Sequence, residues 1–217
     1  LAPGICAGVT FLKSQTRNNP VLSVKTGSPS FPIMRPFPNA TAQEGAMEYV
    51  SRTDHDGISR VVIRRGKVNA FNDAVIDEMS RAFAELALDP SVRSIILTGT
   101  GKFFSFGFDI PQFLGYDRER FTRYLTNFTR LYREIFLHPK PVVAALNGHT
   151  IAGACMVAAS CDYRIMVPGK ARISLNEINF GSSVFAGSVE MLRLLVGPRM
   201  AETVLYSGAL YSAEEAL

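Results

Sequence analysis

Apolar and polar positions follow two different periods along residues 57–217 of the chain. Short apolar runs, typical of buried strands, cover residues 58–63, 92–97, 103–105, 142–146 and 163–167. Segments with helical spacing lie between or after them, at residues 74–88, 118–137, 152–160, 187–196 and 199–206. Strands that alternate with helices predict an α/β class with largely parallel sheets and right-handed crossovers.

Two of these helices carry clear boundary signals. Asn72 is placed to cap the helix over residues 74–88, and Asp89-Pro90 ends it. The helix over residues 118–137 is amphipathic and stops at His138-Pro139. Both helices are therefore expected to pack one apolar face on a sheet.

The stretch 141–181 differs from the rest in its small residues. A strand at 142–146 is broken by Asn147-Gly148, and residues 152–160 then form a helical segment with almost no bulk. Another group can therefore approach this backbone closely. Downstream, Glu177 stands alone among Leu175, Ile178 and Phe180, where desolvation is expected to raise the pKa of its carboxyl group.

Residues 1–46 differ in composition from the remainder. They hold six prolines, no sustained period, and four basic residues against the single acid Glu44. We expect a disordered or non-native extension, with Met47 a natural start; a transit peptide is the alternative. The location would then be the mitochondrial matrix, or the cytoplasm if the protein is bacterial. The chain stops at 212–217 in what looks like a helix beginning, so we expect the protein to continue.

Charge and cysteine content exclude several classes of protein. The 19 basic and 18 acidic residues after residue 46 nearly cancel, which argues against a duplex nucleic-acid binder. No apolar run reaches the ~18 residues of a membrane span. Cys6, Cys155 and Cys161 lack metal spacing, and His149 has no second ligand nearby, so we expect no metal site.

Four motifs in order identify a resemblance. They are Lys67-Val68-Asn69-Ala70-Phe71, Phe104-Ser105-Phe106-Gly107-Phe108-Asp109-Ile110, Asn147-Gly148-x-x-x-Ala152-Gly153 and Ser174-Leu175-Asn176-Glu177. Together they make residues 47–217 similar to the enoyl-CoA hydratase/isomerase (crotonase) superfamily. The resemblance implies a crotonase-like spiral of ββα units that binds an acyl-CoA thioester, here incomplete at its C-terminal helical part.

The resemblance also implies roles for individual residues. The backbone N–H groups of Phe108 and Gly153 would stabilise the negative oxygen of a thioester enolate, and Glu177 would be the acid–base group. The substrate would contact the two motif segments and the residue before the acid, namely Lys67, Asn69, Ala70, Phe106, Gly107, Asp109, Ile110 and Asn176. Coenzyme A would enter as part of the substrate, with no separate cofactor.

Met156 is the informative departure from the family pattern. Hydratases of the family carry a second Glu at this position, and a thioether cannot exchange a proton with water. The sequence around Glu177 is also similar to the Δ3,Δ2-enoyl-CoA isomerase branch, which favours a proton shuttle that converts 3-enoyl-CoA to 2-trans-enoyl-CoA. The alternatives are a hydratase, hydrolase or lyase of the family, or an inactive acyl-CoA-binding protein. The family also implies a homotrimer or a dimer of trimers.

Overall fold

The structure, a computed structural model, describes residues 21–23 and 47–216. Its larger sheet has six strands, and every neighbouring pair is parallel except β2 with β3. Across the sheet their order is β1 (Val21–Ser23), β8 (Tyr163–Met166), β6 (Val142–Leu146), β4 (Ser94–Gly99), β3 (Ile58–Ile63) and β2 (Val50–His55). The predicted α/β class with largely parallel strands is confirmed.

A second sheet is small and wholly parallel. Its order is β5 (Phe103–Ser105), β7 (His149–Ile151) and β9 (Ile173–Ser174). Strands β7 and β9 were not predicted, because β7 directly follows Asn147-Gly148, where the sequence breaks a strand, and β9 has only two residues. The three strands end shortly before Gly107, Gly153 and Glu177, which belong to the sequence motifs.

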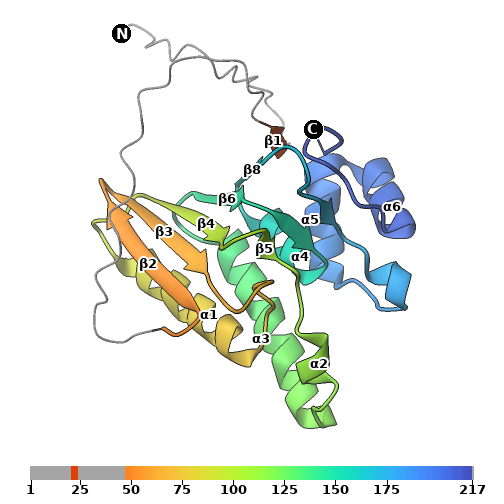
Figure 1. The fold of residues 1–217 in the computed structure, drawn as a ribbon. Helices are drawn as coiled ribbons and strands as arrows, with labels where there is room; N and C mark the ends of the chain where they lie inside the picture. Colours follow the sequence, from red (N-terminus) through yellow and green to blue (C-terminus); the bar gives the residue numbers. More distant parts are fainter. Residues whose placement is uncertain (1–20, 24–46, 217) are drawn as a thin grey trace, which may run out of the picture.

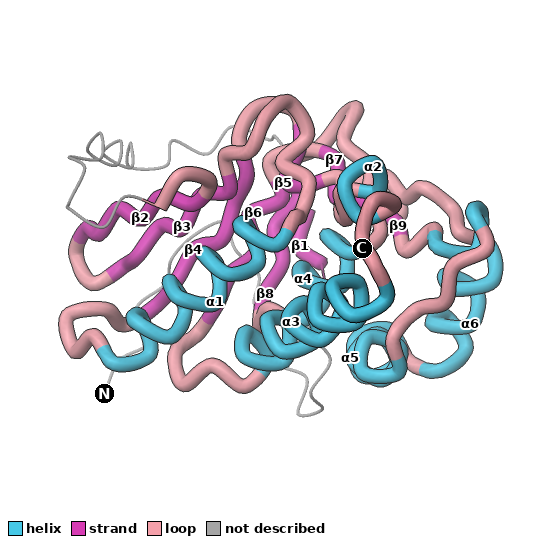
Figure 2. The backbone as a smooth tube through the Cα atoms, turned by 90° about the horizontal axis from the view of Figure 1, so that it is seen from below, coloured by secondary structure: helices cyan, strands magenta, loops and turns pink. Residues whose placement is uncertain are grey.

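The helices cover the sheets in two groups. Helices α1 (Asp73–Leu88) and α3 (Arg118–Phe136) lie side by side on one face of the larger sheet (Figure 2). Helices α5 (Ala186–Val196) and α6 (Pro198–Ser207) lie at the end of the molecule away from β2 and β3 (Figure 1). The short elements are α2 (Ile110–Phe113) and the 3-10 helix η1 (Glu177–Phe180).

The two long helices form as their sequences predict. The Asn72 side chain accepts a hydrogen bond from the Val75 N–H at 3.0 Å and caps α1, as predicted. Asp117 caps α3 in the same way through the N–H of Arg120. The buried positions of α1 include Val75, Met79, Phe83 and Leu86, the face that its spacing predicts.

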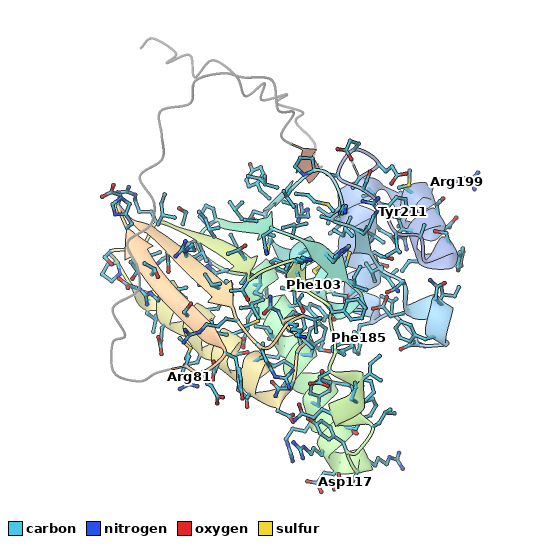
Figure 3. All side chains as sticks on the ribbon, viewed as in Figure 1. Arg81, Phe103, Asp117, Phe185, Arg199 and Tyr211 are labelled. Atoms are coloured by element: carbon cyan, nitrogen blue, oxygen red, sulfur yellow. The ribbon has the colours of Figure 1, made fainter. Side chains whose placement is uncertain are left out.

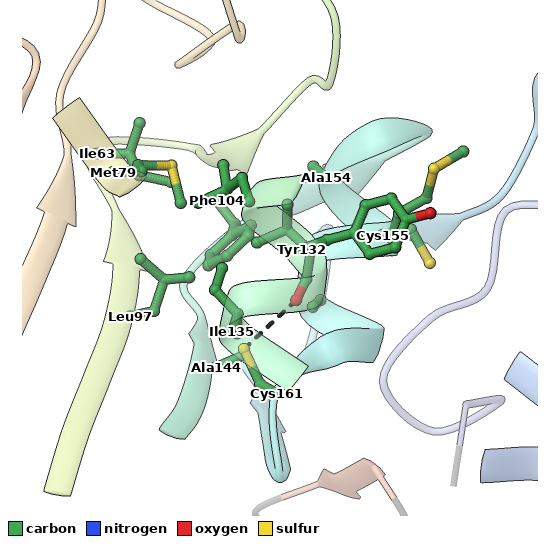
Figure 4. Close-up of a cluster of buried hydrophobic side chains, with 14 of the residues drawn as sticks. Ile63, Met79, Leu97, Phe104, Tyr132, Ile135, Ala144, Ala154, Cys155 and Cys161 are labelled. Atoms are coloured by element: carbon green, nitrogen blue, oxygen red, sulfur yellow. Dashed lines mark hydrogen bonds between the residues drawn. The ribbon is translucent and has the colours of Figure 1, made fainter. Parts of the chain in front are cut away.

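Helix α4 (Gly153–Ser160) is the centre of the molecule. All eight residues are buried, because small side chains let neighbouring elements pack against every face. Ala154 and Cys155 of this helix, and Cys161 directly after it, belong to the main hydrophobic core. Phe104 and Tyr132 lie in the same core (Figure 4). The Cys161 thiol donates to the Val157 carbonyl within this core.

Three features differ from the sequence expectations or extend them. Strand β2 forms a hairpin with β3 through Asp56-Gly57, and its polar outer positions concealed it. Residues 21–23 form strand β1 beside β8; the rest of 1–46 lies outside the described residues. Residues 213–216 form a turn closed by reciprocal bonds between Ser212 and Glu215, not a helix within the described residues.

Candidate active site

The loop after β5 turns sharply at Gly107. Its φ is 84°, and a Cβ atom there would lie 2.6 Å from the Ile151 carbonyl oxygen, so only glycine fits. The Gly107 carbonyl accepts a hydrogen bond from the Phe71 N–H at 2.7 Å, and the Asp109 N–H donates to the Phe71 carbonyl at 2.9 Å. A trans peptide holds its C=O and N–H in opposite directions. The Phe108 N–H therefore faces away from Phe71.

The start of α4 fixes a second N–H by the same logic. The Ala152 carbonyl accepts from the Cys155 N–H at 2.8 Å and so points into the helix. The next N–H, that of Gly153, consequently points out of the helix N-terminus, where the helix dipole is positive. A Cβ atom at Gly107 would lie 3.1 Å from the Gly153 nitrogen, so the two turns are in contact.

A buried polar hub holds the Gly107 loop in place. Asn69, at a left-handed φ of 52° and fully buried, donates to the carbonyls of Thr100 and Phe103. Its side-chain oxygen accepts from the Arg65 N–H and the Thr100 hydroxyl. The Ser105 hydroxyl donates to the Asn69 carbonyl at 2.7 Å and accepts from the Gly107 N–H at 3.0 Å. The hub thus connects the 65–70 loop to the Gly107 turn.

An ion pair ties the same loop to α2. Arg65 lies 2.7 Å from the Asp109 carboxylate and also donates to the Ala70 carbonyl. Asp109 in turn caps α2 by accepting from the Gln112 N–H at 3.2 Å. Asp109 and Asn69 were predicted to contact substrate; in the structure their side chains bind protein groups. Their part in substrate binding stays a prediction.

The Glu177 side chain is buried. It is 2% exposed, and neither carboxyl oxygen has a hydrogen-bond partner among the described residues. Burial therefore raises the pKa of its carboxyl from the usual 4.5 to about 7, the direction that the sequence predicts. Its carbonyl accepts from the Ser182 N–H at 3.0 Å, which closes the 3-10 turn behind it. The side-chain oxygen of the preceding residue, Asn176, is also buried and has no hydrogen-bond partner among the described residues.

The Cys155 thiol of α4 stands near this carboxyl. Burial, together with the negative charge of Glu177, raises the pKa of the Cys155 thiol to about 12, so the thiol stays protonated at neutral pH. Met156 is fully buried and lies one turn beyond Gly153. The described part of the chain contains no group of three metal-ligating side chains.

The small sheet brings the three predicted catalytic positions together. Gly107 and Phe108 follow β5, Gly153 follows β7, and Glu177 follows β9. The strands are parallel, so all three positions lie at one edge, where α/β proteins commonly bind ligands. The Ala152 N–H donates to the Ser174 carbonyl at 2.8 Å and joins the last two segments directly. The segment that leads to the acid therefore lies beside the start of α4.

The predicted substrate-contacting residues divide by exposure. Lys67 is exposed, as are Phe106 and Ile110, whereas Asn69 and Ala70 are buried. The Phe106 N–H donates to the Val68 carbonyl at 2.9 Å, so the two motif segments adjoin. Sequence reasoning missed Arg65 and did not give Ser105 a role of its own. The only available signal was that each lies within or next to a motif.

Comparisons with known proteins bear on the family and the fold of the chain. The enoyl-CoA hydratase/isomerase family profile matches residues 53–217. The chain is 33% identical over 162 residues to the short-chain-enoyl-CoA hydratase of Clostridium acetobutylicum, which covers 74% of this chain and 62% of that protein. It is 31% identical over 163 residues to the mitochondrial enoyl-CoA delta isomerase 1 of Mus musculus. This match covers 74% of this chain and 56% of that protein. The chain thus spans less than two thirds of either relative.

Solved structures show the same fold. An enoyl-CoA hydratase from Bacillus anthracis matches with a TM-score of 0.74 at 26% identity, over 78% of this chain and 66% of that chain. An enoyl-CoA hydratase from Thermoplasma volcanium matches with a TM-score of 0.71 at 30% identity, over 79% of this chain and 68% of that chain. These likenesses confirm the crotonase-like α/β fold that the motifs imply. By its fold, its motifs and the match over residues 53–217, the chain belongs to the enoyl-CoA hydratase/isomerase (crotonase) superfamily.

Proposed function

We propose that this chain carries the active site of an isomerase that converts 3-enoyl-CoA to 2-trans-enoyl-CoA. The observation that carries the proposal is the buried Glu177 carboxyl, with its pKa near 7 and no competing partner among the described residues. A base with a pKa near the operating pH is suited to receive and return a proton. Hydratases of the family have a second carboxylate at the position of Met156. With a thioether there, Glu177 is the one carboxyl group among the proposed catalytic positions.

In the proposed mechanism a single side chain, that of Glu177, carries the proton from one carbon of the substrate to another. The Glu177 carboxylate removes a C2 proton, and the electron pair spreads over C2, C3, C4 and the thioester oxygen as a dienolate. The N–H groups of Phe108 and Gly153 donate to that oxygen and stabilise its charge. Glu177 then returns the proton to C4. The double bond has moved from the C3–C4 position to the C2–C3 position, with no net gain or loss of atoms. Losing one such donor typically costs about 10²–10³ in rate.

Coenzyme A is proposed to enter with the substrate and to contact segments 67–70 and 106–110, with no separate cofactor. The exposed Lys67, Phe106 and Ile110 offer side chains along that path. A homotrimer, as the family implies, stays a prediction that light scattering of the purified chain can measure.

A second candidate is hydration of 2-enoyl-CoA. It is favoured by the identity to the Clostridium acetobutylicum protein, whose name is short-chain-enoyl-CoA hydratase. Hydration needs water to be held and activated by polar groups, and the buried thioether of Met156 does not do this. We therefore place isomerisation first.

The two functions differ in product mass. Purified chain is mixed, in separate assays, with 3-trans-enoyl-CoA and with 2-trans-enoyl-CoA, and each product is followed by absorbance of the conjugated thioester and by mass spectrometry. We expect an isobaric conjugated product and its loss in Glu177→Gln. Glu85→Gln, an exposed change of the same type on α1, should retain activity. Conversion of 2-trans-enoyl-CoA to a product heavier by one water, at a higher rate than isomerisation of 3-trans-enoyl-CoA, contradicts the proposal.

A further inference from the structure

The ring of Phe108 stands directly over Gly153. A Cβ atom at Gly153 would lie 3.1 to 3.4 Å from three atoms at the far end of this ring. The ring therefore occupies the side of Gly153 on which other residues carry a side chain. It belongs to the same residue whose N–H is proposed to polarise the thioester, so the acyl group would lie close to it.

Neighbouring aromatic rings hold Phe108 in place. The Phe128 ring centroid lies 4.6 Å away at an interplanar angle of 75°, in an edge-to-face contact. The Tyr124 ring lies at 5.8 Å, and its hydroxyl donates to the Phe71 carbonyl at 2.8 Å. Both rings come from α3 and are buried. Phe108 is thus part of a fixed surface, not a mobile cover.

Further rings extend this surface toward α5. Phe185, labelled in Figure 3, lies 6.4 Å from Phe108 and 6.0 Å from Phe128 between ring centroids. Tyr132 lies 5.6 Å from Phe128, and its hydroxyl would be 2.9 Å from a Cβ atom at Gly187. We call Phe108, Phe128, Phe185 and Tyr132 the aromatic wall.

We propose that the aromatic wall restricts the acyl group to a short chain of butenoyl size, with Phe108 as the specificity-determining residue; this inference rests on the proposed function. With its oxygen at the N–H groups of Phe108 and Gly153, the acyl chain leads toward the Phe108 ring. A longer chain meets packed rings, and its added methylenes stay unburied. One methylene in such a pocket changes discrimination by about 10–200-fold.

Saturated thioesters test this without requiring turnover. Titration calorimetry compares butanoyl-CoA with decanoyl-CoA, and coenzyme A alone gives the contribution of the nucleotide part. We expect the wild type to favour butanoyl-CoA by about tenfold or more. Phe108→Ala keeps the backbone N–H but removes the ring, and should reduce this preference by about tenfold. Phe108→Leu, which keeps apolar volume if the alanine variant folds poorly, should give a smaller change of the same sign.

Phe136→Ala is the matched control. Phe136 is 47% exposed at the end of α3 and outside the wall, so its loss should leave the preference unchanged. Equal wild-type affinity for both thioesters, or an unchanged preference in both Phe108 variants, overturns the inference. A preserved preference with no isomerisation of 3-enoyl-CoA overturns the proposed function alone. Failure to bind either thioester overturns both.

Discussion

The N–H of Phe71 and the carbonyl of Gly107 are joined by a 2.7 Å hydrogen bond, and this bond sets the direction of the next N–H in the chain. The Gly107–Phe108 peptide is planar, so anchoring its oxygen on one side turns its N–H to the other. The Ser105 hydroxyl holds the preceding peptide at the Gly107 N–H. The orientation of a proposed catalytic donor thus depends on side chains that never touch substrate.

Ser105→Ala should destabilise the protein. It leaves the Asn69 carbonyl and the Gly107 N–H without their buried partner, at a cost of about 1–3 kcal/mol in the free energy of unfolding. Urea denaturation measures this. The control is Ser80→Ala on α1, whose buried hydroxyl has no partner among the described residues. That change should be neutral or stabilising, and equal losses in both variants would contradict the prediction.

Ala152→Gly should stabilise the chain. Ala152 has φ 53° and ψ −122°, a conformation that costs a residue with a Cβ atom about 1–3 kcal/mol and suits glycine. We expect a gain of about 1 kcal/mol in thermal or urea unfolding. Ala154→Gly, two residues later inside α4, should lose about 1 kcal/mol or more. A loss at both positions would show that Ala152 is unstrained.

The pH dependence of stability should reveal Glu177. Its folded pKa of about 7 exceeds its ordinary value of 4.5, so the folded state binds more protons between these values. The contribution of Glu177 to stability is therefore full below pH 4.5 and is lost as pH rises through 7. Relative to Glu177→Gln, the wild type should lose about 3 kcal/mol across this window. Parallel pH profiles for the two proteins would refute the raised pKa.

Activity should show the opposite pH trend. The proposed base acts as a carboxylate, so kcat/KM for 3-enoyl-CoA should fall as pH drops below about 7. The measurement is the initial rate of conjugated thioester formation between pH 5 and 8. A profile that is flat down to pH 5 would exclude Glu177 as the titrating base.

Glu78→Gln should destabilise the protein at a distance from the site. The buried Glu78 carboxylate accepts the N–H groups of Glu48, Tyr49 and Val50 at 2.8–2.9 Å and holds the start of β2. A neutral amide has one acceptor oxygen, so we expect a loss of about 1–3 kcal/mol. Chemical denaturation measures it against Glu85→Gln, an exposed change on the same helix. Equal stability of the two variants would contradict this account.

Periodicity predicted the long elements well because each buries one face. The Asn72 cap and the apolar face of α1 follow directly from spacing, and so do the bounds of β3, β5 and β6. Strand β9 has only two residues and β7 directly follows the Asn147-Gly148 break, so neither could be seen in this way. Their pairing depends on contacts between distant segments, which a local pattern does not encode.

The candidate site was predictable only in part for a similar reason. Gly107, Gly153 and Glu177 were found through motifs, and the structure places them at one sheet edge. The hydrogen bonds made by Asn69 could not be inferred, because its four partner groups come from Arg65, Thr100 and Phe103.

The three-stranded sheet has a consequence for how this protein could change its chemistry. Adjacent strands lie about 4.8 Å apart because backbone hydrogen bonds fix that spacing. The paired main chain, held at the Gly107 turn by the side chains of Asn69 and Ser105, therefore sets where the two amides and the carboxylate-bearing turn stand. If the proposed function holds, we expect single replacements at 108 and 156, which lie outside this hydrogen-bonded frame, to change the substrate or the reaction while the frame stays in place.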